Sequence, residues 1–166
     1  MKIDRTNEFN LGEFLEKHGL FRDLKIKRQN EQALQITELD PSDIKLESFH
    51  VGLSNLGCPN KDWQSRLENS GRIPLDIAVL VALLENPDQI PGCIKNTKGV
   101  RCTIPMTFDG TVLAHGDDRG PEGDEKDSDV DEYIPYLCNS DEGIGVQLIR
   151  SWKGRACLGG DFSVVI

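Results

Sequence analysis

The sequence predicts an α+β fold, in which an antiparallel sheet packs on one buried central helix with one or two short helices beside it. Residues 75–85 are apolar almost all the way round a helix, interrupted only by Asp76 and Glu85. A helix of that kind is buried. Beyond residue 100 the apolar residues alternate as they do in strands. The chain has 166 residues, the length of one domain, which we assign to residues 1–166.

Two prolines bound the central helix. Pro74 suits a first helical position, where the missing N–H is not needed. Pro87 disfavours the α conformation at the residue before it, so we expect the helix to end near Glu85. The helix then has about a dozen residues, fewer than the roughly twenty that cross a bilayer.

The N-terminal half is predicted to contain two short helices and three strands. A helix over 10–19 has Asn10 as its cap and Gly19 as its stop. A second helix is expected over 61–71, because it follows a possible cap and ends in glycine. Alternating apolar residues predict strands from residue 21, over 32–39 and over 44–50.

After the central helix the sequence predicts an antiparallel meander. Strands over 100–108 and 111–115 flank Asp109 and Gly110, a pair favoured in the tight turns of β-hairpins. The last three strands are expected over 133–138, 145–152 and 161–166.

Six segments of the chain share a common pattern with other sequences. They are 3–9, 33–40, 44–47, 84–91, 108–113 and 133–137. In this order they resemble a group of small bacterial hypothetical proteins that have no known activity. The resemblance covers nearly the whole chain. No activity or site is attached to the group, so the resemblance carries no function over to this chain.

Composition favours a cytoplasmic protein. With 37% hydrophobic and 28% charged residues, the chain has the balance of an ordinary globular domain. Its first residues lack the apolar stretch of a secretory signal. The five cysteines are odd in number and include no C-x-x-C pair, which favours reduced thiols and gives no local zinc motif. We therefore expect no cofactor.

Most of the net charge lies in one segment. Residues 116–132, here called the acidic segment, contain nine acidic and two basic residues, which is −7 of the formal charge of −9. Clusters of Lys and Arg, which nucleic-acid binding requires, are limited to residues 25–28. We expect neither nucleic-acid nor membrane binding. The acidic side chains are Asp117, Asp118, Glu122, Asp124, Glu125, Asp127, Asp129, Asp131 and Glu132.

The acidic segment is predicted to be a hairpin loop that binds a basic protein partner, as an inhibitor, an immunity-like protein or a nucleic-acid mimic would. A solvated loop without a binding role, or weak divalent-ion binding by its carboxylates, are the alternatives. Asp127, Asp129 and Asp131 have the spacing of the first EF-hand ligands. Glu132 and Cys138, however, stand where that loop needs Gly and a bidentate Glu, which excludes an EF-hand.

A small hydrolase or transferase with a His/Cys/Asp site is the alternative function. His50 and Cys58 lie at the two ends of one loop, where they would form a base and nucleophile pair. His115 precedes two aspartates at the mouth of the predicted hairpin, which would raise its pKa or build a metal site. Assembly of the chain into a homo-oligomer through an exposed strand at 161–166 is a further hypothesis.

Overall fold

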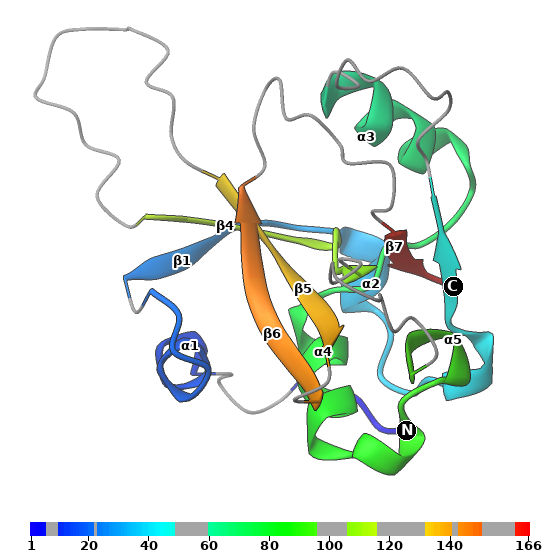
Figure 1. Cartoon of the computed structure of the whole chain (residues 1–166). Helices are drawn as coiled ribbons and strands as arrows, with labels where there is room; N and C mark the ends of the chain where they lie inside the picture. Colours follow the sequence, from blue (N-terminus) through cyan, green and yellow to red (C-terminus); the bar gives the residue numbers. More distant parts are fainter. Residues whose placement is uncertain are drawn as a thin grey trace, which may run out of the picture.

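The computed structural model describes residues 1–5, 10–21, 23–48, 60–95, 106–115, 132–140, 143–150 and 162–166. Within these residues it has both helices and a sheet, which confirms the predicted α+β class (Figure 1). The helices are α1 (Leu11–Lys17), α2 (Glu31–Leu34), α3 (Asn60–Asn69), α4 (Ile77–Glu85) and α5 (Gly92–Lys95), with the 3₁₀ turns η1 (Pro41–Asp43) and η2 (Pro87–Gln89). The strands are β1 (Leu24–Gln29), β2 (Lys45–Glu47), β3 (Met106–Thr107), β4 (Thr111–His115), β5 (Glu132–Ser140), β6 (Gly143–Arg150) and β7 (Phe162–Val165).

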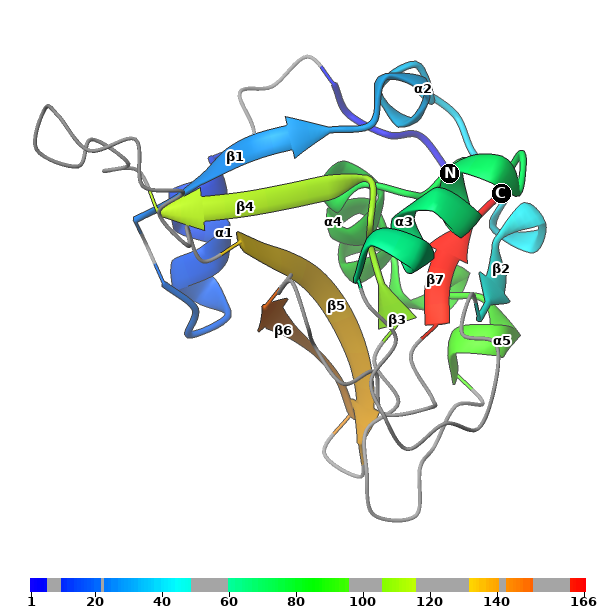
Figure 2. The same ribbon diagram turned by 90° about the horizontal axis from the view of Figure 1, so that it is seen from above.

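The sheet divides at β5. One edge of β5 pairs with β6 along the full length of β6. The other edge is shared, because β4 pairs with Glu132 and Tyr133 at its start and β3 pairs with Tyr136 and Leu137 further along. β1 extends the sheet beyond β4, and β7 and then β2 extend it beyond β3. Figure 2 shows β5 curving between these two wings. Among the described pairs only β3 with β7 is parallel.

The prediction of a β-hairpin around residues 109 and 110 is wrong. The two strands that flank this turn, β3 and β4, each pair with β5 and not with each other. The turn between them packs against the start of the central helix instead. The Gly110 N–H donates to the Leu75 carbonyl oxygen over 3.0 Å. A Cβ on Gly110 would lie 2.5 Å from the Pro74 carbonyl oxygen. This close approach of two backbones, and not a left-handed turn conformation, requires glycine here.

The central helix α4 begins at Ile77, later than the start at Pro74 or Leu75 that the sequence predicts. Pro74 is extended, in an isolated bridge to Val165, and Asp76 is the N-cap. An Asp76 side-chain oxygen accepts from the Val79 N–H (3.2 Å), and the Thr111 hydroxyl oxygen accepts from the Ile77 N–H (3.0 Å). Two of the unpaired donors of the first turn are thereby satisfied. The predicted end of the helix, at Glu85, is confirmed.

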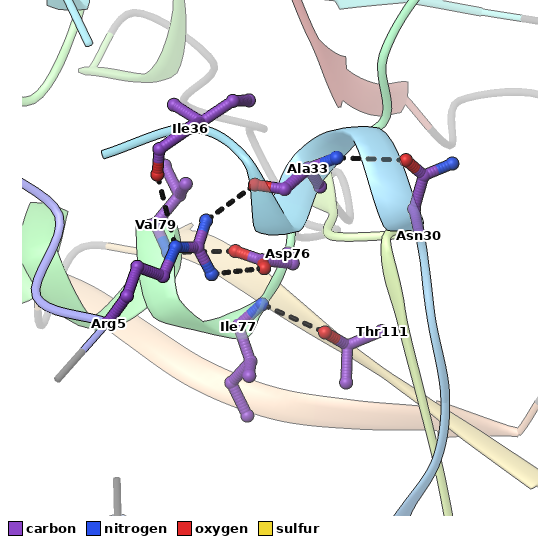
Figure 3. Close-up of polar contacts among 8 residues, drawn as sticks. All are labelled: Arg5, Asn30, Ala33, Ile36, Asp76, Ile77, Val79 and Thr111. Atoms are coloured by element: carbon purple, nitrogen blue, oxygen red, sulfur yellow. Dashed lines mark hydrogen bonds and ion pairs between the residues drawn. The ribbon is translucent and has the colours of Figure 1, made fainter. Parts of the chain in front are cut away.

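Arg5 ties the N-terminal segment to the start of α4 (Figure 3). Its guanidinium donates to the Asp76 carboxylate over 2.6 Å, and also to the carbonyl oxygens of Ala33 and Ile36. Asp76 is fully buried. A buried carboxylate needs a partner of opposite charge, so this contact is structural.

The core lies between α4 and one face of the sheet. Leu80 and Leu83 of α4 belong to one buried cluster with Leu113 of β4, Leu137 of β5 and Val164 of β7. The two buried side chains of α1, Phe14 and Leu15, belong to the same cluster. On the other face of the sheet, Leu67 of α3 packs against Val165. Figure 1 shows α3 and α4 on opposite sides of the strands.

In the N-terminal half the cap and the stop predicted for α1 are confirmed, whereas α3 already includes Asn60, the residue expected to precede it as its cap. Asn10 caps α1, and Gly19 follows it with a φ of 67°. The strand predicted over 32–39 is wrong, because the Asn30 side chain accepts from the Ala33 N–H and starts the short helix α2. That contact satisfies the backbone of the first residues locally. Only the end of the predicted strand is paired, where Glu38 forms an isolated antiparallel bridge to Lys2.

The last strand is also placed differently from the expectation. Residues 161–166 were predicted to form an exposed edge, but β7 pairs with β3 on one side and with β2 on the other. The meander therefore consists of β4, β5 and β6.

Candidate functional site

The acidic segment connects β4 and β5. Glu132 is the first residue of β5, and residues 116–131 lie outside the described part of the chain. Ala114 pairs with Glu132 and Leu113 with Tyr133, so β4 and β5 are antiparallel neighbours. The segment therefore leaves the sheet and returns to it at the same end.

Four side chains gather at this end of the sheet, and we call them the aromatic corner: Phe21, Asp23, His115 and Tyr133. His115 Nδ1 lies 2.6 Å from Asp23 Oδ2. The ring of Phe21 lies 5.9 Å from that of His115 and 6.1 Å from that of Tyr133, and the His115 and Tyr133 rings are 5.7 Å apart. His115 is the last residue of β4 and Tyr133 the second of β5. Ring contacts thus join the ends of β4 and β5, the two strands between which the acidic segment lies in the sequence.

The turn after α1 brings Phe21 and Asp23 to the corner. Leu20 N–H donates to the Leu15 carbonyl oxygen and closes α1, and β1 then starts at Leu24. Leu24 pairs with His115, so the residues just before β1 lie beside the end of β4.

The corner is open to solvent and carries charge. Phe21 is 58% exposed, and the Asp23 side chain is 68% exposed. The hydrogen bond from His115 lowers the pKa of Asp23, because it stabilises the carboxylate. An exposed ring beside an exposed carboxylate is suited to an ammonium or guanidinium group.

Glu132 is the one acidic-segment side chain within the described residues. Its carboxylate lies 3.3 Å from Lys27 Nζ, and the two side chains are 30% and 41% exposed. An ion pair this exposed contributes at most about 1 kcal/mol. Glu132 thus stays available to solvent and to a partner.

The other histidines and cysteines of the predicted sites are partly outside the described residues. His50 and Cys58 lie outside the described residues, so their pairing stays a prediction. His18, at the end of α1, packs its ring 4.7 Å from Phe14, and burial together with Lys17 lowers its pKa. Cys93 is exposed and Cys138 is buried. Within the described residues, only His115 has a carboxylate hydrogen-bonded to its ring.

A groove on the α3 side of the sheet was missed by sequence reasoning. It has a volume of about 520 Å³ and lies between β1, α2, α3 and the turn at Gly110. Arg28 and Arg72 line it together with Glu31, Glu68 and Asp109. Because charges of both signs line it, the groove favours neither an anion nor a cation. No local motif could have predicted it, since its walls come from four distant parts of the chain.

Among the described residues there is no group of three or more His, Cys, Asp or Glu side chains placed to hold a metal ion. The helices in the same ranges include none with the length and apolar character needed to cross a membrane. Comparison of the chain with protein families, with curated proteins and with solved structures found no match.

Proposed function

We propose that this protein acts by binding a basic protein partner through the acidic segment, with the aromatic corner as the fixed part of the same surface. The role would be that of an inhibitor, an immunity-like protein or a mimic of nucleic acid. The proposal includes the cytoplasm as its compartment, because the cysteines are odd in number and Cys93 and Cys138 are free thiols. The resemblance to small bacterial proteins stays a prediction.

One observation carries the proposal. The residues that flank the acidic segment, His115 of β4 and Glu132 of β5, belong to paired strands, and His115 lies beside Asp23 and Phe21. Residues 116–131 between them contain eight acidic residues. Concentrated charge of one sign speeds the approach of an oppositely charged partner and selects against others. An exposed aromatic ring next to it adds a contact for a lysine or arginine side chain.

The test uses a lysine- and arginine-rich peptide as the probe and isothermal titration calorimetry as the measurement. One variant replaces the eight acids of 116–131 by their amides. A matched control replaces eight acids elsewhere on the surface, which changes the net charge equally. These are Glu13, Glu16, Glu31, Glu38, Asp43, Glu68, Glu85 and Asp88.

We expect the affinity of the segment variant for the peptide to fall about tenfold or more. The affinity of the control variant should stay close to that of the natural chain. Phe21→Ala should weaken binding as well, by about threefold to tenfold, because one cation–π contact is lost. Equal losses in the segment and control variants would mean that only the net charge matters, which contradicts the proposal.

A second candidate is an acid–base enzyme, and the His115–Asp23 contact favours it. A carboxylate bonded to one ring nitrogen of a histidine orients the ring and fixes its tautomer, as in many general bases. Hydrolysis of small activated esters by the natural chain and by His115→Phe tests this function. Identical background rates would contradict it.

A further inference from the structure

One histidine of the aromatic corner holds a carboxylate and a phenyl ring side by side. His115 Nδ1 lies 2.6 Å from Asp23 Oδ2, and the His115 ring also contacts the ring of Phe21. The Asp23 side chain and Phe21 are each more than half exposed. Because both contact the same imidazole ring, the corner presents an oriented negative charge and an open aromatic ring to the same incoming side chain.

The ring of Phe21 rests on residues that the sheet holds in place. It is inclined by 57° to the ring of His115 and by 51° to that of Tyr133. Tyr133 is buried and belongs to the main core cluster, and His115 ends β4. Tilted contacts of this kind support a ring without covering it as parallel stacking would. A ring that is already ordered loses little conformational freedom when a ligand binds.

A guanidinium group suits this arrangement better than an ammonium group. A guanidinium is planar, so it stacks on an aromatic ring while its N–H groups donate to a carboxylate at the side. It is also more weakly hydrated than an ammonium, and therefore loses less solvation when it contacts a ring. The ammonium of lysine is a compact and strongly hydrated charge, which keeps its water at a site as exposed as this one.

We propose that the aromatic corner binds an arginine side chain of the partner in preference to a lysine side chain, with the guanidinium stacked on Phe21 and hydrogen-bonded to the Asp23 carboxylate. The inference rests on the proposed function, in which the acidic segment attracts any basic partner. The corner then selects among basic residues. His115 is a positioning residue, and its bond to Asp23 lowers the pKa of that carboxyl, which keeps it ionised over a wider pH range.

Two peptides of equal length and charge test the proposal, one with arginine at every basic position and one with lysine. Calorimetry at about 150 mM salt measures the ratio of their affinities for each protein. The natural chain should bind the arginine peptide about threefold to tenfold more tightly than the lysine peptide. Phe21→Leu keeps an apolar side chain without the ring, and Asp23→Asn removes the charge, so each should lower this ratio by about threefold.

The matched control is Asp43→Asn, which makes the same change at an exposed position of η1 and should leave the ratio as it is in the natural chain. Equal affinities for the two peptides, or a ratio that Phe21→Leu does not change, would overturn the proposal. Salt-sensitive binding of both peptides would still support the acidic segment as the binding surface in that case. If neither peptide binds, the proposed function and this inference are both overturned.

NMR titration of the natural chain keeps the test decisive if Phe21→Leu does not fold. Nα-acetylargininamide and Nα-acetyllysinamide each offer one side-chain cation, so they report on the corner and not on the charge of a whole peptide. The ring protons of Phe21 and His115 should shift at lower concentrations of the arginine compound. Equal shifts at equal concentrations would overturn the preference.

Discussion

Arg5 and Asp76 form an ion pair across 71 residues of sequence, and the carboxylate in this pair is fully buried. The pair fixes the start of α4, and α4 in turn supports the sheet that ends at the aromatic corner. Asp76 has two roles, since one oxygen caps the helix while the other binds Arg5.

Removal of Arg5 should therefore be strongly destabilising. Arg5→Met leaves Asp76 buried without its partner, which we expect to lower the free energy of unfolding by about 3–5 kcal/mol. Arg72→Met removes a partly exposed pair with Glu47 (2.7 Å) and should cost about 1 kcal/mol or less. Urea unfolding of the two variants measures the difference, and similar losses would show that the buried pair has no special role.

Gly110 should tolerate no side chain. Gly110→Ala places a Cβ 2.5 Å from one backbone oxygen and 2.8 Å from another, and the required shift should cost about 1–3 kcal/mol. Gly12→Ala is the matched control, because the position is in helix α1 and a Cβ there would lie 3.4 Å from the Asn10 side-chain oxygen, an ordinary contact distance. That change should be neutral or stabilising by up to about 1 kcal/mol. Thermal unfolding that ranks the two variants in the opposite order would contradict the close approach at Gly110.

The pKa of Asp23 should depend on His115. The hydrogen bond lowers the pKa of Asp23 in the folded chain. The stabilisation of the fold by this bond is therefore fully present above the pKa that Asp23 has in the unfolded chain, and it is lost as pH falls through the lower pKa of the folded chain. His115→Phe keeps a ring and removes the donor, and should raise the pKa of Asp23 toward its ordinary value. Asp40 serves as an internal control, because bonds from Ser42 lower its pKa. Carboxyl carbon NMR titration measures both groups, and an unchanged Asp23 would refute the coupling.

Cys138 should react more slowly than Cys93 with iodoacetamide. Burial raises the pKa of the Cys138 thiol, which reduces the fraction of reactive thiolate, and the side chain is also less accessible. Cys93 is exposed. Peptide mapping by mass spectrometry reports each site separately. Faster labelling of Cys138 in the native chain would contradict its placement in β5.

Features with local causes could be predicted from the sequence. The Asn10 cap, the Gly19 stop and the end of α4 before Pro87 each depend on residues within one helical turn. The pairing of strands could not, because it depends on contacts between distant segments. Position 110 illustrates this limit. Glycine is required there because the backbone of Pro74 and Leu75 approaches closely, and not because of the hairpin turn that the sequence suggested.

In the candidate site, too, the sequence predicted the local feature and not the contacts between distant residues. The acidic segment could be located from composition alone, because a cluster of acidic residues can be read in the sequence without knowledge of which residues contact it. The contact between Asp23 and His115 joins residues 92 apart in sequence, and no spacing rule predicts it. The basic residues of 25–28, which counted only as a weak nucleic-acid signal, protect an edge strand and bind Glu132 through Lys27.

The salt dependence of peptide binding tests the central claim most directly. Affinity of the natural chain for the lysine- and arginine-rich peptide would be measured by calorimetry at about 50 mM and about 500 mM salt, because screening shortens the reach of charge between these concentrations. We predict an affinity that falls about tenfold or more for the natural chain and much less for the variant without the eight carboxylates. Salt-independent binding, or the same salt dependence in both proteins, would contradict a function based on the acidic segment.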